Sequence, residues 1–183
     1  MRLLGFTVAG SLLTLSLGAC GSDDPVTPGD SDAQTPPTTG RVAVEAWLAD
    51  ATYNDWACEA AIHASRDPSP HGFNRICSND VLAANVSGTA DWPKGSAGVK
   101  ELYASASATT PIGFAVYLKT DADSAGGDNW YWYERINSDT IADGMGDSGP
   151  AKTICVGCHI GAGIDLAHTP TPGGRDQVYT PVQ

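Results

Sequence analysis

The run Cys155-Val156-Gly157-Cys158-His159 near the C-terminus constrains this chain more than any other feature. In a C-x-x-C-H pattern, each of the two thiols can form a thioether to one haem vinyl group. The histidine that follows is then held under the iron as its proximal ligand. The pattern therefore predicts one covalently attached haem c, with Cys155 and Cys158 as attachment points and His159 as the metal ligand.

Two other interpretations of the same residues fit less well. A thioredoxin-like C-x-x-C belongs early in a βαβ unit, whereas this run follows a glycine-rich stretch close to the end of the chain. A structural zinc site needs a second Cys/Cys or Cys/His pair at short spacing, and the neighbouring sequence offers none. Haem attachment remains the better interpretation.

The N-terminus predicts export. A minimal basic start, Met1-Arg2, precedes a short apolar stretch, Leu3–Leu17, which is too short for a transmembrane helix. It ends in Leu17-Gly18-Ala19-Cys20, which resembles the bacterial lipobox, so residues 1–19 are expected to be a lipoprotein signal peptide and Cys20 the lipidated residue. The alternative is an ordinary signal peptide with an incidental cysteine.

A tether follows the expected lipidation site. Residues 20–40 are rich in Pro, Gly, Thr and Asp and have no hydrophobic period, so they are expected to be a disordered linker. Residues 41–183 then form one folded domain. Such a protein belongs in the bacterial cell envelope, anchored through lipid alone and facing the periplasm.

Two cysteines, Cys58 and Cys77, are left without a role in lipidation or haem attachment. In an oxidising periplasm they are expected to form a disulfide, and the alternative is two separate buried thiols. The formal net charge of −11 makes nucleic acid an unsuitable partner. An acidic surface suits a basic redox partner protein, and it serves solubility equally well.

Apolar periodicity and turn residues predict one helix followed by strands. The helix covers 42–51, and no glycine closely follows to mark its end. Three well-marked strands are expected at 96–104, 112–120 and 130–137, the last two joined as an antiparallel hairpin. Weaker signals indicate strands near 60–64 and 73–78, a helical turn at 81–85, an irregular stretch at 139–150 and a short helix carrying the haem cysteines. The expected fold class is α+β, with a mostly antiparallel β-sheet, a few helices and a C-terminal haem segment.

The face of the iron opposite His159 decides between electron transfer and ligand binding. Apart from the initiator, the chain has one methionine, Met145, which lies in a flexible Gly-Met-Gly run on the N-terminal side of the haem motif. The histidines that remain are His63, His71 and His168, and His71 between Pro70 and Gly72 fits a turn or hydrogen-bonding residue better than a ligand. We therefore expect a vacant or water-bound sixth position.

In this order along the chain, several segments resemble the cytochrome P-460 and cytochrome c′-beta family. They are Tyr53-Asn54-Asp55-Trp56, His71-Gly72-Phe73-Asn74-Arg75, Lys94 to Leu102 (KGSAGVKEL), Ile112-Gly113-Phe114, Asn129-Trp130, the C-x-x-C-H run and Asp176-Gln177-Val178-Tyr179. The resemblance covers most of the folded part. It implies a mono-haem protein, often dimeric, that binds or converts small nitrogen species such as NO or hydroxylamine.

The resemblance also implies roles for single residues. Lys100 falls on the position whose side chain bonds covalently to the haem edge in P-460 members, where the bond supports hydroxylamine oxidation. The alternative is that Lys100 packs beside the haem or pairs with a propionate. Arg75 matches the pocket arginine, whose fork of donors can steady an iron-bound oxyanion; otherwise it is a surface or propionate-pairing residue.

One departure from the family pattern concerns catalysis. The position that carries a carboxylate base in active hydroxylamine oxidisers is Ala115 here, and alanine accepts no proton. Phe73 and Phe114 are instead expected to cap a distal pocket beside Ala115, which favours neutral diatomic ligands. Whether the protein is an enzyme is thus left open. The rivals are a gas-binding or sensing module without turnover, and a six-coordinate electron-transfer cytochrome using His168 or Met145.

Overall fold

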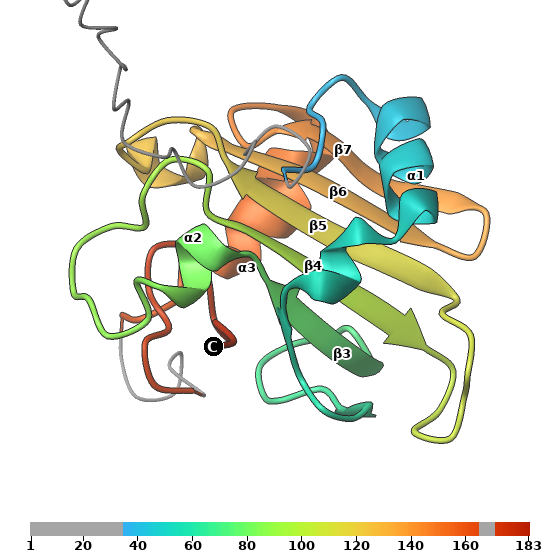
Figure 1. Ribbon diagram of the computed structural model, residues 1–183. Coiled ribbons are helices and arrows are strands. Elements are labelled where there is room, and N and C mark those ends of the chain that lie inside the picture. Colours follow the sequence, from blue (N-terminus) through green and yellow to red (C-terminus); the bar gives the residue numbers. More distant parts are fainter. Residues whose placement is uncertain (1–34, 165–170) are drawn as a thin grey trace, which may run out of the picture.

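A central antiparallel sheet dominates the computed structural model, which describes residues 35–164 and 171–183 (Figure 1). Five strands follow one another as a meander in which each strand pairs with the next. These strands are β3 (Phe73–Ser78), β4 (Ala97–Tyr103), β5 (Gly113–Lys119), β6 (Trp130–Ile136) and β7 (Asp139–Met145). Two short strands, β1 (Ala57–Cys58) and β2 (His63–Ala64), pair with the outer side of β3. The predicted α+β class with a mostly antiparallel sheet is confirmed.

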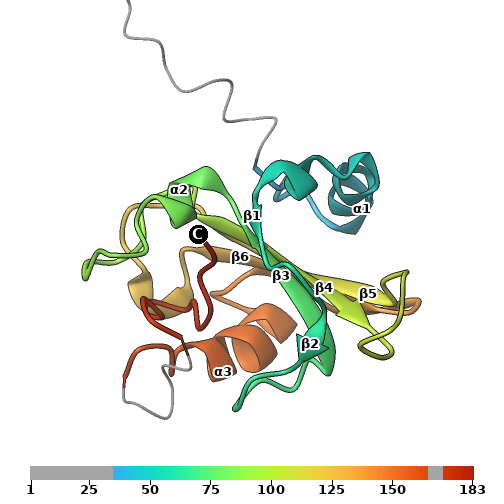
Figure 2. The ribbon, with the colours of Figure 1, turned by 60° about the horizontal axis from the view of Figure 1, so that its bottom comes forward.

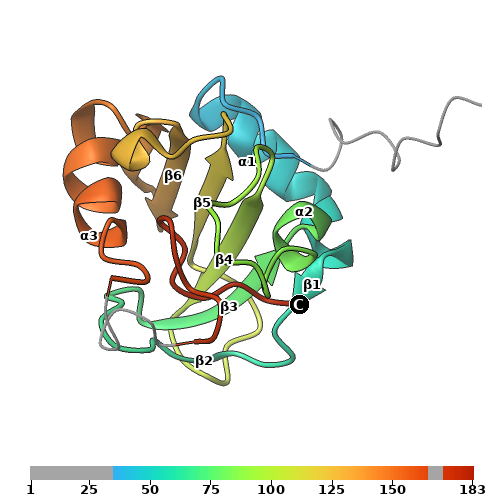
Figure 3. The same cartoon turned by 90° about the vertical axis from the view of Figure 1, so that its left-hand side faces the viewer.

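The helices are short and lie around this sheet. They are α1 (Arg41–Asp50), the single turn η1 (Thr52–Asp55), α2 (Asp80–Ala83), the turn η2 (Ala125–Gly127), the π-helical η3 (Ala151–Val156) and its α-helical continuation α3 (Gly157–His159). Figures 2 and 3 show α1 on one face of the sheet and α3 on the other, which makes three layers.

Most elements lie where the sequence predicts them. The helix at 42–51, the strand at 73–78 and the three strands expected at 96–104, 112–120 and 130–137 agree with the structure to within about a residue at each end. The expected helical segment around the C-x-x-C-H run is also present, as η3 and α3.

The stretch 139–150 was wrongly expected to be irregular, because its first half forms strand β7. Its sequence, DTIADGM, has two aspartates and a glycine, which are uncommon in strand interiors. β7 is the last strand in the sheet order, and edge strands tolerate charged residues because their outer side faces solvent. Pairing with β6 therefore decides its structure, against its own propensity.

Both faces of the sheet are buried, and each face has its own apolar cluster. The cluster under α1 contains Val44, Leu48, Tyr53, Trp56, Cys77, Ala97, Val99, Val116, Leu118, Tyr131 and Tyr133. The cluster under η3 and α3 contains Leu82, Trp92, Tyr117, Trp130, Trp132, Ala142, Ala151, Cys155, Val156 and Val178. Because side chains alternate between the faces of a strand, the aromatic run of β6 supplies both clusters.

The folded part begins earlier than the expected boundary at residue 41. Pro36 is already fully buried, and the backbone N–H of Arg41 donates to Asp143 Oδ2 at 2.7 Å. The last residues of the expected 20–40 tether thus belong to the folded domain. The expected signal peptide and Cys20 lie outside the described residues. Within the described ranges, no helix is both long and apolar enough to span a bilayer.

Cys58 and Cys77 form a disulfide between β1 and β3, in agreement with the expected pairing. Cys77 is completely buried in the cluster under α1. The bond therefore fixes the short β1 to the sheet and joins it to the core.

Two features of the sheet shape the face that carries η3 and α3. A β-bulge at Glu134 and Arg135 adds an extra residue, Ile141, to β7, and bulges of this kind re-aim side chains. In β4, Gly98 lies opposite Tyr117 of β5. A Cβ atom at Gly98 would lie 2.3 Å from Tyr117 Oη, so the phenol ring rests directly on the glycine backbone.

We expect Gly98→Ala to lower the free energy of unfolding by about 1–3 kcal/mol, because its methyl group must displace the ring of Tyr117. Urea unfolding followed by tryptophan fluorescence measures this change. The same substitution in a Tyr117→Leu background should cost much less, since the clash is then absent. An equal cost in both backgrounds would contradict this explanation.

Candidate functional site

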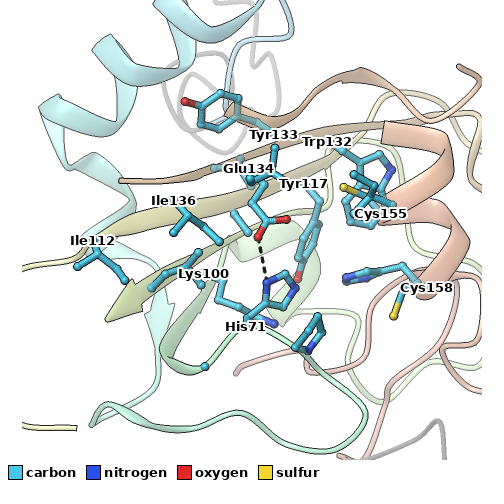
Figure 4. Close-up of a pocket in the computed structure, with 18 of the residues that line it drawn as sticks. His71, Lys100, Ile112, Tyr117, Trp132, Tyr133, Glu134, Ile136, Cys155 and Cys158 are labelled. Atoms are coloured by element: carbon cyan, nitrogen blue, oxygen red, sulfur yellow. Dashed lines mark ion pairs between the residues drawn. The ribbon is translucent and has the colours of Figure 1, made fainter. Parts of the chain in front are cut away.

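A cavity of about 410 Å³ lies between the sheet and the C-terminal helix. This volume is within the usual range for ligand pockets, roughly 300–1,000 Å³. Its wall is mostly apolar, and β3 contributes only through the loop that precedes it. The lining residues include Pro70, His71, Lys100, Leu102, Tyr103, Ile112, Ala115, Tyr117, Trp132, Glu134, Ile136, Ile141, Ile154, Cys155, Cys158 and His159. Figure 4 shows the two cysteines entering from the helix and the other labelled side chains from the sheet and its loops.

The floor of the cavity is a row of cross-strand neighbours. Lys100 of β4 pairs with Ala115 of β5, which pairs with Glu134 of β6. Because directly opposed residues point to the same face, all three side chains lie on the cavity side. Ala115 has the smallest side chain of the row, so the space between the amine of Lys100 and the carboxylate of Glu134 is left open.

The C-x-x-C-H residues lie together at the end of the helical segment. Cys155 is in the π-helical turn, whereas Cys158 and His159 are in the α-helical turn that follows. Residues three apart in a helix are neighbours on its surface, so both thiols border the same cavity. Cys155 is buried and Cys158 is exposed, so one thiol is at the inner end of the cavity and the other near its mouth.

His159 is held with one ring nitrogen free. Its Nδ1 lies 2.6 Å from the backbone oxygen of Gln177, and a carbonyl oxygen can only accept, so Nδ1 donates and Nε2 keeps its lone pair. Metal-ligating histidines are oriented in this way. Burial lowers the pKa of His159 to about 3, and the positive charge of Lys100 contributes to the same shift. The imidazole is therefore neutral at physiological pH, as metal ligation requires.

The acceptor carbonyl belongs to a tight turn. Asp176 and Gln177 have φ values of 39° and 71°, and Arg175 and Val178 exchange both backbone hydrogen bonds at 2.8 Å. Positive φ at both central residues defines a type I′ turn. The turn directs the Gln177 carbonyl toward the imidazole of His159.

A buried ion pair fixes this turn to the sheet. Lys119 Nζ lies 2.7 Å from Asp176 Oδ2, with the two side chains 0% and 4% exposed. The same carboxylate oxygen accepts from the backbone N–H of Trp92 at 2.9 Å. The indole N–H of Trp92 in turn donates to the carbonyl of Arg175 at 2.9 Å. Lys119 and Trp92 thus position the residues that orient His159.

The cavity also contains a histidine–carboxylate pair. His71 Nδ1 lies 3.3 Å from Glu134 Oε1, and the two side chains are 12% and 9% exposed (Figure 4). Burial lowers the pKa of His71 below its ordinary value, although the carboxylate of Glu134 opposes this change. His71 thus lines the cavity as a neutral imidazole that is paired with a carboxylate, which agrees with the expected turn or hydrogen-bonding role.

Lys100 points into the cavity from the centre of the sheet. Burial lowers the pKa of its amine to about 8, even though the nearby Glu134 carboxylate favours the charged form. A measurable fraction of Lys100 is therefore an uncharged, nucleophilic amine near neutral pH.

Three of the expected distal residues lie on the other face of the sheet. Arg75 donates through Nη1 to Glu101 Oε2 at 3.1 Å and through Nε to the carbonyl of Glu59 at 3.0 Å. Phe114 packs against the cluster under α1. Phe73 is two residues from Arg75 on the same strand and so shares its face. Arg75, Phe73 and Phe114 do not line this cavity, contrary to their expected place in the pocket, whereas Lys100 and Ala115 line it together with the residues of the C-x-x-C-H run.

The other expected sixth ligands are not brought to the cavity. Met145 packs in the cluster under α1, on the face opposite His159. His63 contacts Glu59 through Nε2 at 2.8 Å and does not line the cavity. His168 lies outside the described residues. Across 35–164 and 171–183, no cluster of three His, Cys, Asp or Glu side chains is arranged to hold a metal ion by itself.

Glu134, His71 and Gln177 are the site residues that sequence reasoning did not assign. Alternation along β6 puts Glu134 on the same face as Trp130 and Trp132, which was the available signal. It was not sufficient, because both faces of β6 are apolar and the pattern does not tell which face carries the haem motif. Gln177 contributes only a backbone oxygen, which no side-chain pattern reveals.

Comparison with known proteins adds no assignment, because neither a scan against models of protein families nor a search of curated proteins finds a match.

We expect Asp176→Ala to lower the free energy of unfolding by about 3–5 kcal/mol, because it leaves the ammonium of Lys119 buried without a partner. Chemical denaturation measures the loss, and adding Lys119→Met should recover a large part of it. Asp128→Ala is the matched control, since Asp128 pairs with Lys152 at the exposed surface, where such pairs contribute less than about 1 kcal/mol. Equal losses from the two aspartate variants would contradict the structural role of the buried pair.

Proposed function

We propose that this protein carries one covalent haem c on Cys155 and Cys158, with His159 as the proximal ligand. The observation that carries the proposal is the hydrogen bond from His159 Nδ1 to the Gln177 carbonyl. It leaves Nε2 as the coordinating atom of a neutral imidazole at the wall of a largely apolar cavity that also contains both thiols. A haem-binding histidine needs this combination of orientation, neutrality and low polarity.

The residues of the cavity fit a haem chemically. The apolar side chains that suit the macrocycle are Leu102, Ile112, Ile136, Ile141 and Ile154, together with Trp132 and Tyr117. Both histidines among the lining residues are neutral, and the charged side chains there are Lys100 and Glu134. When bound, the haem supplies a redox-active iron that binds small ligands. The protein's own residues supply its attachment, its axial imidazole and the distribution of charge around it.

The same residues support binding or redox conversion of small nitrogen species, NO or hydroxylamine. Oxidation of hydroxylamine releases protons, and these need an acceptor inside the pocket. Ala115 cannot accept them, but its cross-strand neighbour Glu134 brings a carboxylate to the same part of the cavity. The missing carboxylate at position 115 is thus no argument against turnover. A gas-binding module without turnover is the second candidate, favoured by the apolar wall.

Under this proposal, the side chain of Lys100 has one of two roles beside the haem. As in the P-460 members that the sequence resembles, its amine could replace a hydrogen at the haem edge, provided that an external oxidant removes two electrons and the two protons are released. The lowered pKa of Lys100 favours the nucleophilic form that such a bond would need. Otherwise it packs beside the macrocycle, where its charge can pair with a propionate. Proteolysis and mass spectrometry separate the two, because a cross-link would keep the Lys100 peptide attached to the haem peptide.

The cellular setting belongs to the same proposal. A lipid anchor on Cys20 would hold the domain at the periplasmic side of a bacterial membrane. Haem c is attached after export, so this location suits the C-x-x-C-H run. A basic redox partner protein suits the acidic surface, with a formal net charge of −11. A homodimer, as in related proteins, is compatible with these features.

We expect the purified wild-type protein to retain haem after denaturation, and Cys155→Ala/Cys158→Ala to lose it. Haem staining of a denaturing gel and the pyridine haemochrome spectrum measure the covalent attachment. The matched control is Cys58→Ala/Cys77→Ala, which removes the disulfide but leaves both thioether positions intact. The proposal is contradicted if the wild-type protein carries no covalent haem after expression with a haem c maturation system.

If the protein oxidises hydroxylamine, we expect Glu134→Gln to slow turnover by about 100-fold or more, since a general base contributes roughly 10²–10⁴ in rate. Hydroxylamine-dependent reduction of an electron acceptor measures this. Glu59→Gln is a well-matched control, because Glu59 also contacts a histidine, His63, but lies outside the cavity. A wild-type protein that binds NO reversibly without any turnover would identify the gas-binding module instead.

A further inference from the structure

The rings of His71 and His159 face one cavity from two unrelated parts of the chain. His159 ends the C-terminal helix, whereas His71 lies in the loop between β2 and β3. Their ring centroids are 6.5 Å apart, with the ring planes inclined at 56°. No single helix or strand within the described residues carries both histidines, so the tertiary fold brings the two rings together.

Both rings are oriented in the same way. His159 uses Nδ1 for the Gln177 carbonyl at 2.6 Å, and His71 uses Nδ1 for the Glu134 carboxylate at 3.3 Å. In each case Nε2 is left available for another partner. Carbonyl and carboxylate oxygens on the far nitrogen are the usual supports of metal-bound imidazoles. His71 therefore has the same kind of hydrogen-bonded support that orients metal-binding histidines.

The separation of the two rings matches a single metal ion between them. A bond from an imidazole nitrogen to a first-row metal is about 2 Å long, so two rings on opposite sides of one ion have centres roughly 6 Å apart. A histidine that only hydrogen-bonds to a ligand on the iron has to stand farther away, because that ligand occupies the space between. The observed 6.5 Å is close to the separation expected for direct coordination by both rings.

We propose that His71 is the second axial ligand of the haem iron, opposite His159, and that a small ligand such as NO must displace it to bind. This inference rests on the proposed haem attachment and replaces the expected vacant or water-bound sixth position. Glu134 then acts as a positioning residue, which orients His71 through Nδ1. Because His71 lies in a loop outside the strands, its ring can leave the iron without breaking the pairing of the sheet.

Absorption and EPR spectra of the ferric holoprotein test this inference. The wild-type spectrum should be low-spin, and His71→Ala should become high-spin and recover a low-spin spectrum on addition of imidazole. His71→Ala should also bind NO or CO with an apparent affinity roughly 10-fold or more above wild type, because no internal ligand competes. His63→Ala is the control, since His63 lies on the neighbouring β2 outside the cavity, and its spectrum should match wild type.

Two results would overturn the inference. One is a high-spin spectrum in both wild type and His71→Ala, and the other is an unchanged low-spin spectrum in the variant, which would assign the sixth position to another group. Both leave haem attachment, and with it the proposed function, intact. Absence of covalent haem from the wild-type protein would overturn both proposals together.

A measurement on the wild-type protein alone covers the case in which His71→Ala fails to fold or to retain haem. Pulsed EPR resolves the nitrogen couplings of axial imidazoles on low-spin ferric haem. Two coupled imidazoles are expected, and one would count against His71 as a ligand.

Discussion

The buried ion pair between Lys119 and Asp176 is the interaction on which the geometry of the site depends. It fixes the C-terminal turn at the end of β5, and the turn holds the carbonyl that orients His159. An ammonium and a carboxylate with almost no exposure are costly to desolvate, and Asp176 Oδ2 accepts a further hydrogen bond from the backbone N–H of Trp92. This buried charge pair lies next to an apolar cluster, and through the turn it fixes the position of one imidazole nitrogen of His159.

A sheet buried on both faces is the second constraint. Because α1 covers one face and the helical segment with the C-x-x-C-H run covers the other, the central strands β5 and β6 supply buried side chains to both clusters. Only small or well-placed residues leave room for a cavity in such a structure. Ala115 leaves the centre of the floor open, Gly98 lets Tyr117 lie close to the backbone, and the bulge at Glu134 brings Ile141 to the cavity wall. Three polar side chains enter this apolar space, those of Lys100, Glu134 and His71.

The sequence predicted the positions of the helices and strands better than it predicted which face of the sheet each side chain occupies. Strands with dense β-branched and aromatic residues, such as β6, were found within about a residue of their ends, whereas the edge strand β7 was missed because its pairing overrides its composition. Arg75 was assigned to the pocket by resemblance, yet its strand directs it toward Glu101 on the other side of the sheet. The local pattern shows that side chains alternate between the two faces of a strand. It does not show which of two apolar faces packs against the helix with the C-x-x-C-H run, because contacts between distant parts of the sequence decide this.

The sequence by itself determined the chemical nature of the proposed cofactor site, since two thiols and a histidine at fixed spacing lie on one short segment and need no tertiary information to be recognised. It also predicted the antiparallel fold class and the pairing of Cys58 with Cys77, both of which the structure confirms. The tertiary structure alone decided which groups gather around the imidazole of His159. Glu134, His71 and the Gln177 carbonyl come from three separate parts of the chain, and only the packing of a loop, a strand and a turn around one cavity brings them within reach of each other.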